Sequence, residues 1–311
     1  MTIDHFLDKS HGKDGFSTEF EPILRIDPGT GETIGFETSD EMYAQIDERR
    51  DLSQVDAQIN PVTGPVYVNG AEPGDALKIT IVDIQLIDRG WSVFLPGAGA
   101  LQDRMGETWA QKIPLKDGVA KLTEKYEAPV RPMIGCIGTA PAEGKASTVM
   151  PSYATGGNMD LTDACPGSVV YVPVEVEGAY LSIGDIHAIM ARGESSFVAI
   201  EAEGTAVLKI DLIKDMNLRA PRIETEDEWC FIGIGNPVQE SIQRGYEDLF
   251  DFLVENGVSK EDAYILMSAE AHSELGGPTG SDDPDPLHPF TPKGAVTVHR
   301  LPKAVLEAYS K

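Results

Sequence analysis

The sequence predicts an α+β, β-rich fold, in which twisted sheets form a sandwich or barrel-like body and a helical segment follows near the C-terminus. Over the first two thirds of the 311 residues, apolar and polar residues alternate at period two, as in strands that bury one face. The 31 glycines and 21 prolines supply turns between these strands. After about residue 236 the apolar residues recur at the helical spacings of three and four. We therefore assign residues 1–218 to the β-rich body and residues 219–311 to an α/β portion packed on it, as one compact unit.

Three stretches show the strand pattern most clearly. In residues 76–88 the apolar positions are 77, 79 and 81 and then shift to 82, 84 and 86, which predicts a β-bulge or a bend. Residues 167–176 carry four valines on one face, and Pro173 favours an edge strand or a bulge there. Residues 205–215 point four apolar side chains inward, namely Ala206, Leu208, Ile210 and Leu212.

Three helices are expected in the C-terminal portion. Asn236 can cap the first helix and Pro237 can occupy its first position, and an apolar stripe through Tyr246 and Leu253 ends at Gly257. A capping box of Ser259 and Asp262 begins the second helix, which should run to about Ser268. A short third helix is expected from near Pro302 through Leu306.

The charge and the cysteines limit the partners and the compartment. Fifty-one acidic and 25 basic residues give a net charge of −26, which repels phosphate backbones and anionic lipid surfaces. We expect no nucleic acid partner and no membrane, because no window approaches the ~20 apolar residues of a membrane span. The N-terminal residues lack the apolar core of a secretory signal, and three cysteines without CxxC spacing favour a reducing compartment. The expected location is the cytoplasm.

Four blocks of sequence carry a family resemblance. They are "NPVTGPVYVNGAEPGDALKITIVDI" (60–84), "RPMIGCIGTAPAEG" (131–144), "TGGNMD" (155–160) and "GSVVYVPVEVEGAYLSIGDIHAIMARGESSFVAIE" (167–201). In this order they resemble the acetamidase/formamidase family of short-chain amide hydrolases. The resemblance implies hydrolysis of formamide, acetamide or a similar small neutral amide to carboxylate and ammonia. It also implies a homo-oligomeric cytoplasmic enzyme with a divalent metal in its site, for which zinc is our first candidate and calcium or magnesium are alternatives.

Two departures from the family pattern fall in these blocks. Thr155 stands where the family usually has histidine before "GGN", and "ARGE" places Ala191 and Arg192 where the family has glycine and aspartate. Both changes lie where the resemblance puts the chemistry. They raise a rival hypothesis, that of a non-catalytic relative which binds a small ligand or acts as an oligomeric scaffold.

Amide hydrolysis needs a nucleophile, stabilisation of the oxyanion and a proton donor for the leaving amine. The sequence has no GxSxG elbow and no cysteine in a catalytic context, so a metal-bound water remains the economical hypothesis. Asp160, after paired glycines, is a candidate ligand or catalytic residue, and its alternative role is a turn residue that binds a nearby N–H. Asn158 is a candidate donor to the substrate or oxyanion.

His187 and Glu194 complete the candidate set. His187 could bind metal while Asp185 fixes its tautomer or itself acts as a ligand, and the alternative is a buried histidine bonded to a backbone carbonyl. Glu194 is the candidate general base, and its alternative is a salt bridge with Arg192.

Arg192 cannot ligate a cation, which leaves three explanations. The metal survives with fewer ligands, with His272 replacing the lost histidine; or Arg192 supplies the positive charge itself and orients the substrate; or the site is inactive. The acidic segment 281–290 could bind calcium, but it lacks EF-hand spacing and is more simply a solvated loop, a lid or a contact with a neighbouring subunit. Cys136 is expected to be a small buried apolar residue.

Overall fold

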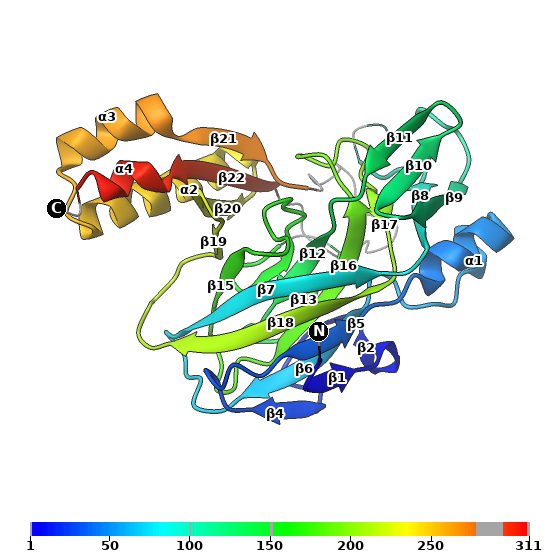
Figure 1. Cartoon of the computed structure of the whole chain (residues 1–311), viewed down its shortest axis with the longest axis horizontal. Helices are drawn as coiled ribbons and strands as arrows, with labels where there is room; N and C mark the ends of the chain where they lie inside the picture. The colour runs from blue at the N-terminus through cyan, green and yellow to red at the C-terminus, as the bar shows by residue number, and fades with distance from the viewer. Residues whose placement is uncertain (1, 100, 102, 150–151, 278–294, 310–311) are drawn as a thin grey trace.

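The computed structural model describes residues 2–99, 101, 103–149, 152–277 and 295–309, and two large sheets dominate it (Figure 1). The first sheet has nine strands, in spatial order β1 (His5–Leu7), β5 (Ile34–Glu37), β18 (Gly204–Ile213), β7 (Ala76–Leu86), β15 (Val169–Pro173), β19 (Arg222–Glu224), β20 (Glu228–Gly235), β22 (Ala295–Pro302) and β21 (His272–Leu275). The β-rich prediction is confirmed.

The second sheet has eleven strands. Its main path is β11 (Tyr126–Pro129), β10 (Val119–Thr123), β9 (Trp109–Lys116), β8 (Arg89–Phe94), β17 (Ile200–Glu201), β16 (Leu181–Ile189), β12 (Met133–Gly138) and β14 (Gly156–Asn158). Strand β6 (Val62–Val68) joins β16 and carries β2 (Gly12–Lys13) and β4 (Leu24–Ile26). A small separate sheet pairs β13 (Ala146–Ser147) with β3 (Gly15–Phe16).

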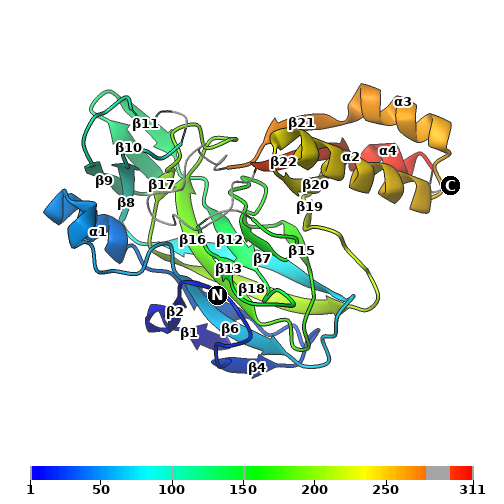
Figure 2. The same ribbon diagram turned by 180° about the vertical axis from the view of Figure 1, so that it is seen from behind.

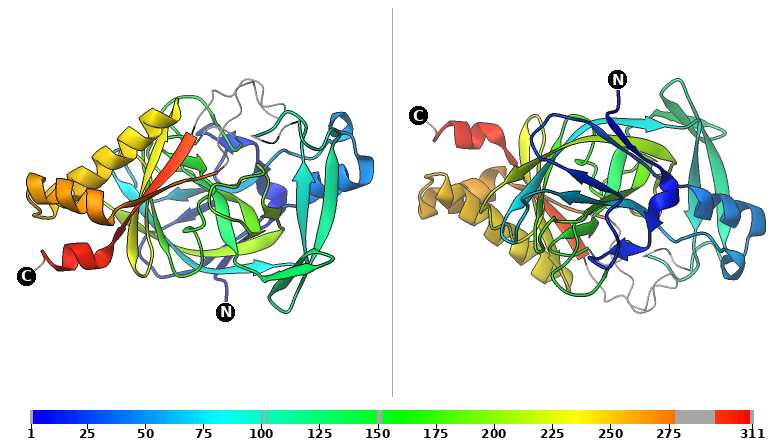
Figure 3. Two further views of the ribbon diagram at one scale, coloured as in Figure 1. Left: turned by 90° about the horizontal axis from the view of Figure 1, so that it is seen from above. Right: turned by 90° about the horizontal axis from the view of Figure 1, so that it is seen from below.

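The helices lie at the two ends of the molecule. Helix α1 (Glu41–Arg49) lies at the end where β8 to β11 extend, and α2 (Val238–Glu255), α3 (Lys260–Glu270) and α4 (Lys303–Glu307) gather at the opposite end, as Figures 1 and 2 show from two sides. The views from above and below in Figure 3 show the same separation. Two short 3₁₀ turns complete the list, η1 (Lys9–His11) and η2 (Leu52–Gln54). None of the helices in the described part of the chain is long and apolar enough to cross a membrane.

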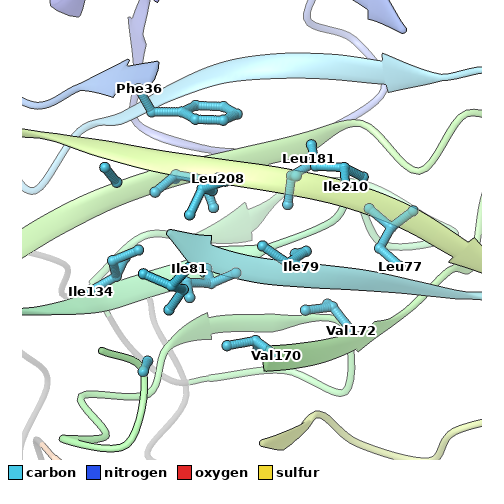
Figure 4. Close-up of a cluster of buried hydrophobic side chains, with 14 of the residues drawn as sticks. Phe36, Leu77, Ile79, Ile81, Ile134, Val170, Val172, Leu181, Leu208 and Ile210 are labelled. Carbon is cyan, nitrogen blue, oxygen red and sulfur yellow. The ribbon is translucent and has the colours of Figure 1, made fainter. Parts of the chain in front are cut away.

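The largest core lies between the two sheets. Ile79 and Leu208 from the nine-stranded sheet pack in one buried cluster with Ile134 and Leu181 from the eleven-stranded sheet, and Figure 4 shows these side chains together. Strands that bury one face against a second sheet need the alternating pattern seen in the sequence. The sandwich-like arrangement therefore follows directly from the period-two pattern.

The shift of pattern in β7 is a β-bulge, as predicted. Val207 of β18 lies opposite Asp83, and the next residue, Leu208, lies opposite Ile81, so Val82 is the extra residue. The bulge returns Ile84 to the buried face. Strand β15 is not an edge strand, because Val169, Val170 and Tyr171 pair with β7 on one side and β19 on the other, but Pro173 itself lies at an edge position, paired with β7 alone. Pro173 is tolerated there because it is the last residue of β15, beyond the part paired with β19.

The C-terminal helices are confirmed, with differences in the start of α2 and in the face that it buries. The side chain of Ser259 accepts a hydrogen bond from the backbone N–H of Asp262 and so caps α3. Asn236 does not cap α2 as expected, because Pro237 occupies the cap position and the helix begins at Val238 without a side-chain cap. The buried positions of α2 include Gly245 and Leu249, whereas Tyr246 of the expected stripe is 38% exposed. At the interface between α2 and the nine-stranded sheet, small and polar residues of the helix contact polar groups of the strands.

A chain of hydrogen bonds runs from the surface of α2 into this interface. The hydroxyl of Tyr246 lies 2.9 Å from that of Ser273, which lies 2.8 Å from Nδ1 of His299. On the other side of the ring, Nε2 lies 3.0 Å from the hydroxyl of Thr297, which lies 2.7 Å from that of Ser241. Because Ser241 donates to the carbonyl of Gly233, the chain assigns the ring proton to Nε2, and His299 is satisfied as a neutral imidazole.

The expected boundary near residue 218 lies inside one sheet. Strand β15 before it pairs with β19 after it, so hydrogen bonds run across the boundary. The division into 1–218 and 219–311 remains a prediction.

Candidate active site

Five ionisable side chains meet around a small cavity of about 40 Å³. They come from separate elements: Asp160 follows β14, Asp185 and His187 lie on β16, Glu194 lies in the loop after β16, and Glu201 lies on β17. The structure thus brings together Asp160, Asp185, His187 and Glu194, the acidic and histidine residues singled out in the sequence. Their side chains are all nearly or fully buried.

Strand pairing explains why these residues meet. Strand β12 lies between β14 and β16, so Asp160, two residues after "GGN", comes close to β16. On the other side of β16, Glu201 is the direct partner of His187. Gly135 of β12 leaves the space between the acids, because a Cβ atom there would lie 2.3 Å from Oδ1 of Asp160 and 2.5 Å from Oδ2 of Asp185.

One nitrogen of the imidazole faces three carboxylates. Nε2 of His187 lies 3.3 Å from Oδ1 of Asp185, 3.4 Å from Oε2 of Glu201 and 3.7 Å from Oδ1 of Asp160. Glu201 is held in turn by the hydroxyl of Tyr43, which donates to Oε2 at 2.9 Å, and by a backbone N–H that donates to Oε1. These contacts differ from the alternative expected for His187, which was a buried histidine bonded to a backbone carbonyl.

The pKa values follow from burial and crowding. Burial alone would lower the pKa of His187, but the carboxylates of Glu201, Asp185 and Asp160 outweigh it and raise that pKa to about 10. Burial raises the pKa of Glu201 to about 8 and holds the pKa values of Asp160 and Glu194 well above their usual range. Burial also opposes ionisation of Asp185, yet the adjacent His187 keeps its pKa below the usual range. One imidazolium cannot neutralise four carboxylates, so the cluster requires bound protons or a cation.

Three buried polar atoms of the cluster have no hydrogen-bond partner among the described residues. They are Oδ1 of Asp160, Nδ1 of His187 and Oε2 of Glu194. The candidate ligand atoms of the cluster form two groups of three, and within each group the atoms lie within 4.8 Å of one another. One group comes from Asp160, Asp185 and His187, and the other from His187, Glu194 and Glu201. Carboxylate oxygens with an imidazole nitrogen are a donor set that suits zinc, and carboxylates alone suit calcium or magnesium. The residues present therefore fit a divalent cation.

The backbone around the cavity is unusual in the same place. Asp160, Asp185 and Glu194 have φ values of 45°, 59° and 38°, and Asn60 and Phe197, which also line the cavity, have values of 43° and 75°. Positive φ is uncommon for residues other than glycine and tends to occur at functional sites, where the surrounding structure enforces it. Here the flanking strands hold the loop and turn residues in these conformations.

Asn158 also lines the cavity. Its Oδ1 accepts a hydrogen bond from Nδ2 of Asn60 at 3.3 Å, and Asn60 donates as well to the carbonyl of Thr148 at 2.8 Å. This contact orients the Asn158 side chain, so that its amide N–H groups can face a bound molecule.

Arg192 and His272 do not reach the cavity. The Arg192 side chain is 48% exposed, and its guanidinium lies 3.1 Å from Glu274 and 3.8 Å from Asp163, not beside Glu194. It therefore provides no charge at the cluster, contrary to the hypothesis that it replaces the metal, because the turn at Gly193 directs it to the outer surface of the loop. His272 is exposed on β21, so it does not replace the missing histidine.

Two other sequence features are placed as follows. Thr155 is buried, but it is not among the residues that line the cavity, and its carbonyl accepts from the N–H of Thr139. Cys136 is buried as expected. The segment 281–290 lies outside the described residues.

Sequence reasoning missed Glu201, Tyr43 and Gly135. Glu201 had a signal, since it is a charged residue directly after the apolar run "FVAI". Tyr43 had none, because it reaches Glu201 over a separation of 158 residues. Nothing in the sequence distinguished Gly135 from the other glycines.

The comparisons with known proteins agree with this geometry. The model of the acetamidase/formamidase family matches residues 5–144 and 142–277, which is most of the chain. The chain belongs to the acetamidase/formamidase family. The resemblance seen in the sequence is confirmed, and the five ionisable residues of the cavity all lie in the second matched segment.

Acetamidase/formamidase structures have the same fold. A predicted acetamidase/formamidase from the thermophile Thermoanaerobacter tengcongensis is 30% identical, with a TM-score of 0.86 and coverage of 99% of this chain and 98% of that one. Acetamidase from Bacillus halodurans is 29% identical, with a TM-score of 0.87 and coverage of 98% and 100%. The acetamidase of Mycolicibacterium smegmatis is 29% identical over 57% of this chain and 60% of its own. The chain spans less than two thirds of the length of the curated relatives it matches, between 56% and 63%.

Proposed function

We propose that this protein hydrolyses the C–N bond of a small carboxamide of the formamide or acetamide type to carboxylate and ammonia. The observation that carries the proposal is the small cavity in which Asp160, Asp185, His187, Glu194 and Glu201 converge, inside the segment that matches the family. A neutral amide of a few atoms suits a buried space of this size, and a neutral substrate is not repelled by the net charge of −26.

Asp160, Asp185 and His187 are the proposed metal ligands, with zinc as the first candidate and calcium or magnesium as alternatives. When bound, zinc would lower the pKa of a coordinated water to about 7, and any of these cations would polarise a carbonyl oxygen. Glu201, whose Oε2 lies 3.4 Å from the same Nε2 of His187, is proposed to add negative charge beside the cation, and Tyr43 fixes Glu201.

Glu194 is the proposed general base. Its Oε2 is buried without a described partner in the cavity, and burial raises its pKa toward the range in which a carboxyl group both accepts and returns a proton. In this role it takes a proton from the attacking water and delivers it to the departing amine. The N–H groups of Asn158 donate to the substrate oxygen, on which negative charge develops.

The non-catalytic alternative rested on Thr155 and Arg192. Neither residue lines the cavity, whereas the other candidates all do, namely Asn158, Asp160, Asp185, His187 and Glu194. This supports catalysis over the alternative of a binding protein or scaffold. Cytoplasmic location and a homo-oligomeric state remain expectations from the resemblance.

The test is ammonia release from formamide, acetamide and propionamide by purified protein, before and after chelation and with zinc, calcium or magnesium returned. The Glu194→Gln variant should lose about 10²- to 10⁴-fold in turnover, the range for loss of a general base. Glu226→Gln, at an exposed position, is the matched control. Near-normal turnover in Glu194→Gln would remove this residue from the base role, and no ammonia from any amide would favour the non-catalytic alternative.

A further inference from the structure

The lining of the cavity is of two chemical kinds. Besides the ionisable cluster, it includes six apolar residues, which we call the apolar wall: Met42, Ile59, Leu95, Val149, Phe197 and Val198. Met42 and Leu95 belong to a second hydrophobic cluster, separate from the main core, and Ile59, Phe197 and Val198 pack against that cluster. A molecule in the cavity therefore meets both polar groups and a set of apolar side chains, most of which pack together.

This apolar wall is fixed in position. Helix α1, which carries Met42, follows Asp40, whose buried carboxylate accepts hydrogen bonds from Nε of Arg89 and Nε1 of Trp91, each at 2.8 Å. One residue after Met42, Tyr43 donates to Glu201 in the polar cluster. The helix is thus tied both to β8 and to the ionisable cluster, so the distance between the apolar wall and that cluster is set by the fold.

The volume leaves little room for a substrate. About 40 Å³ corresponds to roughly three water-sized groups, so the cavity leaves no room for a long acyl chain. An acyl substituent must extend against the apolar wall, since the ionisable cluster holds the groups that the amide itself needs.

We propose that the apolar wall is an acyl subsite, which takes the substituent R of an amide RCONH₂ and limits it to hydrogen or methyl, with Met42 as the residue that sets this limit. The inference rests on the proposed function and deepens it. Met42 is chosen because it is 6% exposed, lines the cavity and lies on the helix that is tied to both β8 and the ionisable cluster.

The chain offers a matched control for Met42. Ile46 lies one turn further along α1, is fully buried in the same hydrophobic cluster, and is not among the residues that line the cavity. Met42→Ala and Ile46→Ala both remove a large apolar side chain from the same helix face. Only the first should enlarge the cavity.

The experiment measures kcat/KM for formamide, acetamide, propionamide and butyramide with the native protein and both variants. One methylene that a pocket does not accommodate typically costs about 10-fold or more. In Met42→Ala, the ratio of kcat/KM for acetamide to that for butyramide should fall by about 10-fold or more, while Ile46→Ala keeps the native ratio. A converse variant, Leu95→Phe, should lower acetamide turnover relative to formamide.

The outcomes separate the two proposals. If all three proteins release ammonia from formamide and the chain-length ratios do not change in Met42→Ala, the acyl subsite is refuted and the proposed function stands. If Ile46→Ala changes the ratio as much as Met42→Ala, a general loosening of α1 is responsible and Met42 does not set the limit. If no amide is hydrolysed by any of the proteins, the proposed function fails and the subsite fails with it.

Discussion

Acidification should destabilise the protein through His299, the neutral imidazole at the centre of the hydrogen-bond chain between α2 and β22. This side chain is fully buried. Burial, and to a smaller extent the neighbouring Arg300, lower its pKa from 6.5 to about 4. The remaining groups that face the ring, the hydroxyls of Ser273 and Thr297 and the ring of Tyr246, carry no charge near neutral pH.

The sign and size of this destabilisation follow from the linkage between proton binding and folding. Between about pH 6.5 and pH 4 the unfolded chain binds a proton at this histidine that the folded chain does not, so the free energy of unfolding falls as the pH falls. A difference of about 2.5 pKa units corresponds to about 3 kcal/mol in full, of which about 2 kcal/mol is lost between pH 7.5 and pH 5. Below about pH 4 this contribution changes no further.

The assay is urea unfolding at pH 7.5 and pH 5, followed by circular dichroism, for the native protein and for His299→Gln. The variant should be less stable at pH 7.5, but it should lose about 2 kcal/mol less than the native protein on acidification. His272→Gln, at an exposed histidine, serves as the control and should keep the native pH dependence. An equal loss in His299→Gln and the native protein would refute the reasoning.

Three further predictions concern the site and its support. Gly135→Ala should lower amidase turnover by at least about 10²-fold, because the added Cβ displaces the carboxylates of Asp160 and Asp185, and steady-state ammonia release measures this. Zinc at 100 times its dissociation constant should raise the free energy of unfolding of the chelated protein by about 2.7 kcal/mol, which urea unfolding with and without zinc measures. Asp163→Ala should cost about 3 kcal/mol or more in the same assay, because among the described residues it leaves Glu274 as the single acidic partner of the buried Arg300.

Each of these predictions has a contradicting result. Unchanged turnover in Gly135→Ala would show that activity does not depend on the native positions of the Asp160 and Asp185 carboxylates beside this glycine. Equal stabilisation by zinc in an Asp160→Asn variant would place the cation elsewhere. A loss below about 0.5 kcal/mol in Asp163→Ala, the usual size for a surface substitution, would mean that Arg300 finds solvent or another partner.

Local patterns predicted the parts of the fold that local physics determines. The alternating residues of β7 and β18 and the capping side chain of Ser259 each act within a few residues, so the strands, the bulge at Val82 and the start of α3 were visible in the sequence. Helix α1 was not predicted, since its inward face offers only Met42 and Ile46 at helical spacing. Pro173 was read as a sign of an edge strand, because a sequence does not show where the pairing of a neighbouring strand ends.

The site was predicted in part for the same reason. Asp185 and His187 are two residues apart on one strand, so a shared direction of their side chains follows from the period of a strand. The approach of Glu201 depends on the register between β16 and β17, and that of Tyr43 on the placement of α1. Arg192 could not be placed, because the direction of a loop side chain depends on the dihedral angles of the turn that carries it.

The order of strands in the nine-stranded sheet has a consequence for biosynthesis. β5 lies between β1 and β18, and Ile34 is paired with Leu208, a partner 174 residues later in the chain. At about 5 to 20 residues per second, the ribosome adds that partner roughly 10 to 30 seconds after β5 has been made. During this interval the nascent N-terminal strands present unpaired edges and apolar side chains such as Phe36, which holdase chaperones recognise. Folding of this chain on the ribosome should therefore depend on such protection until β18 has emerged.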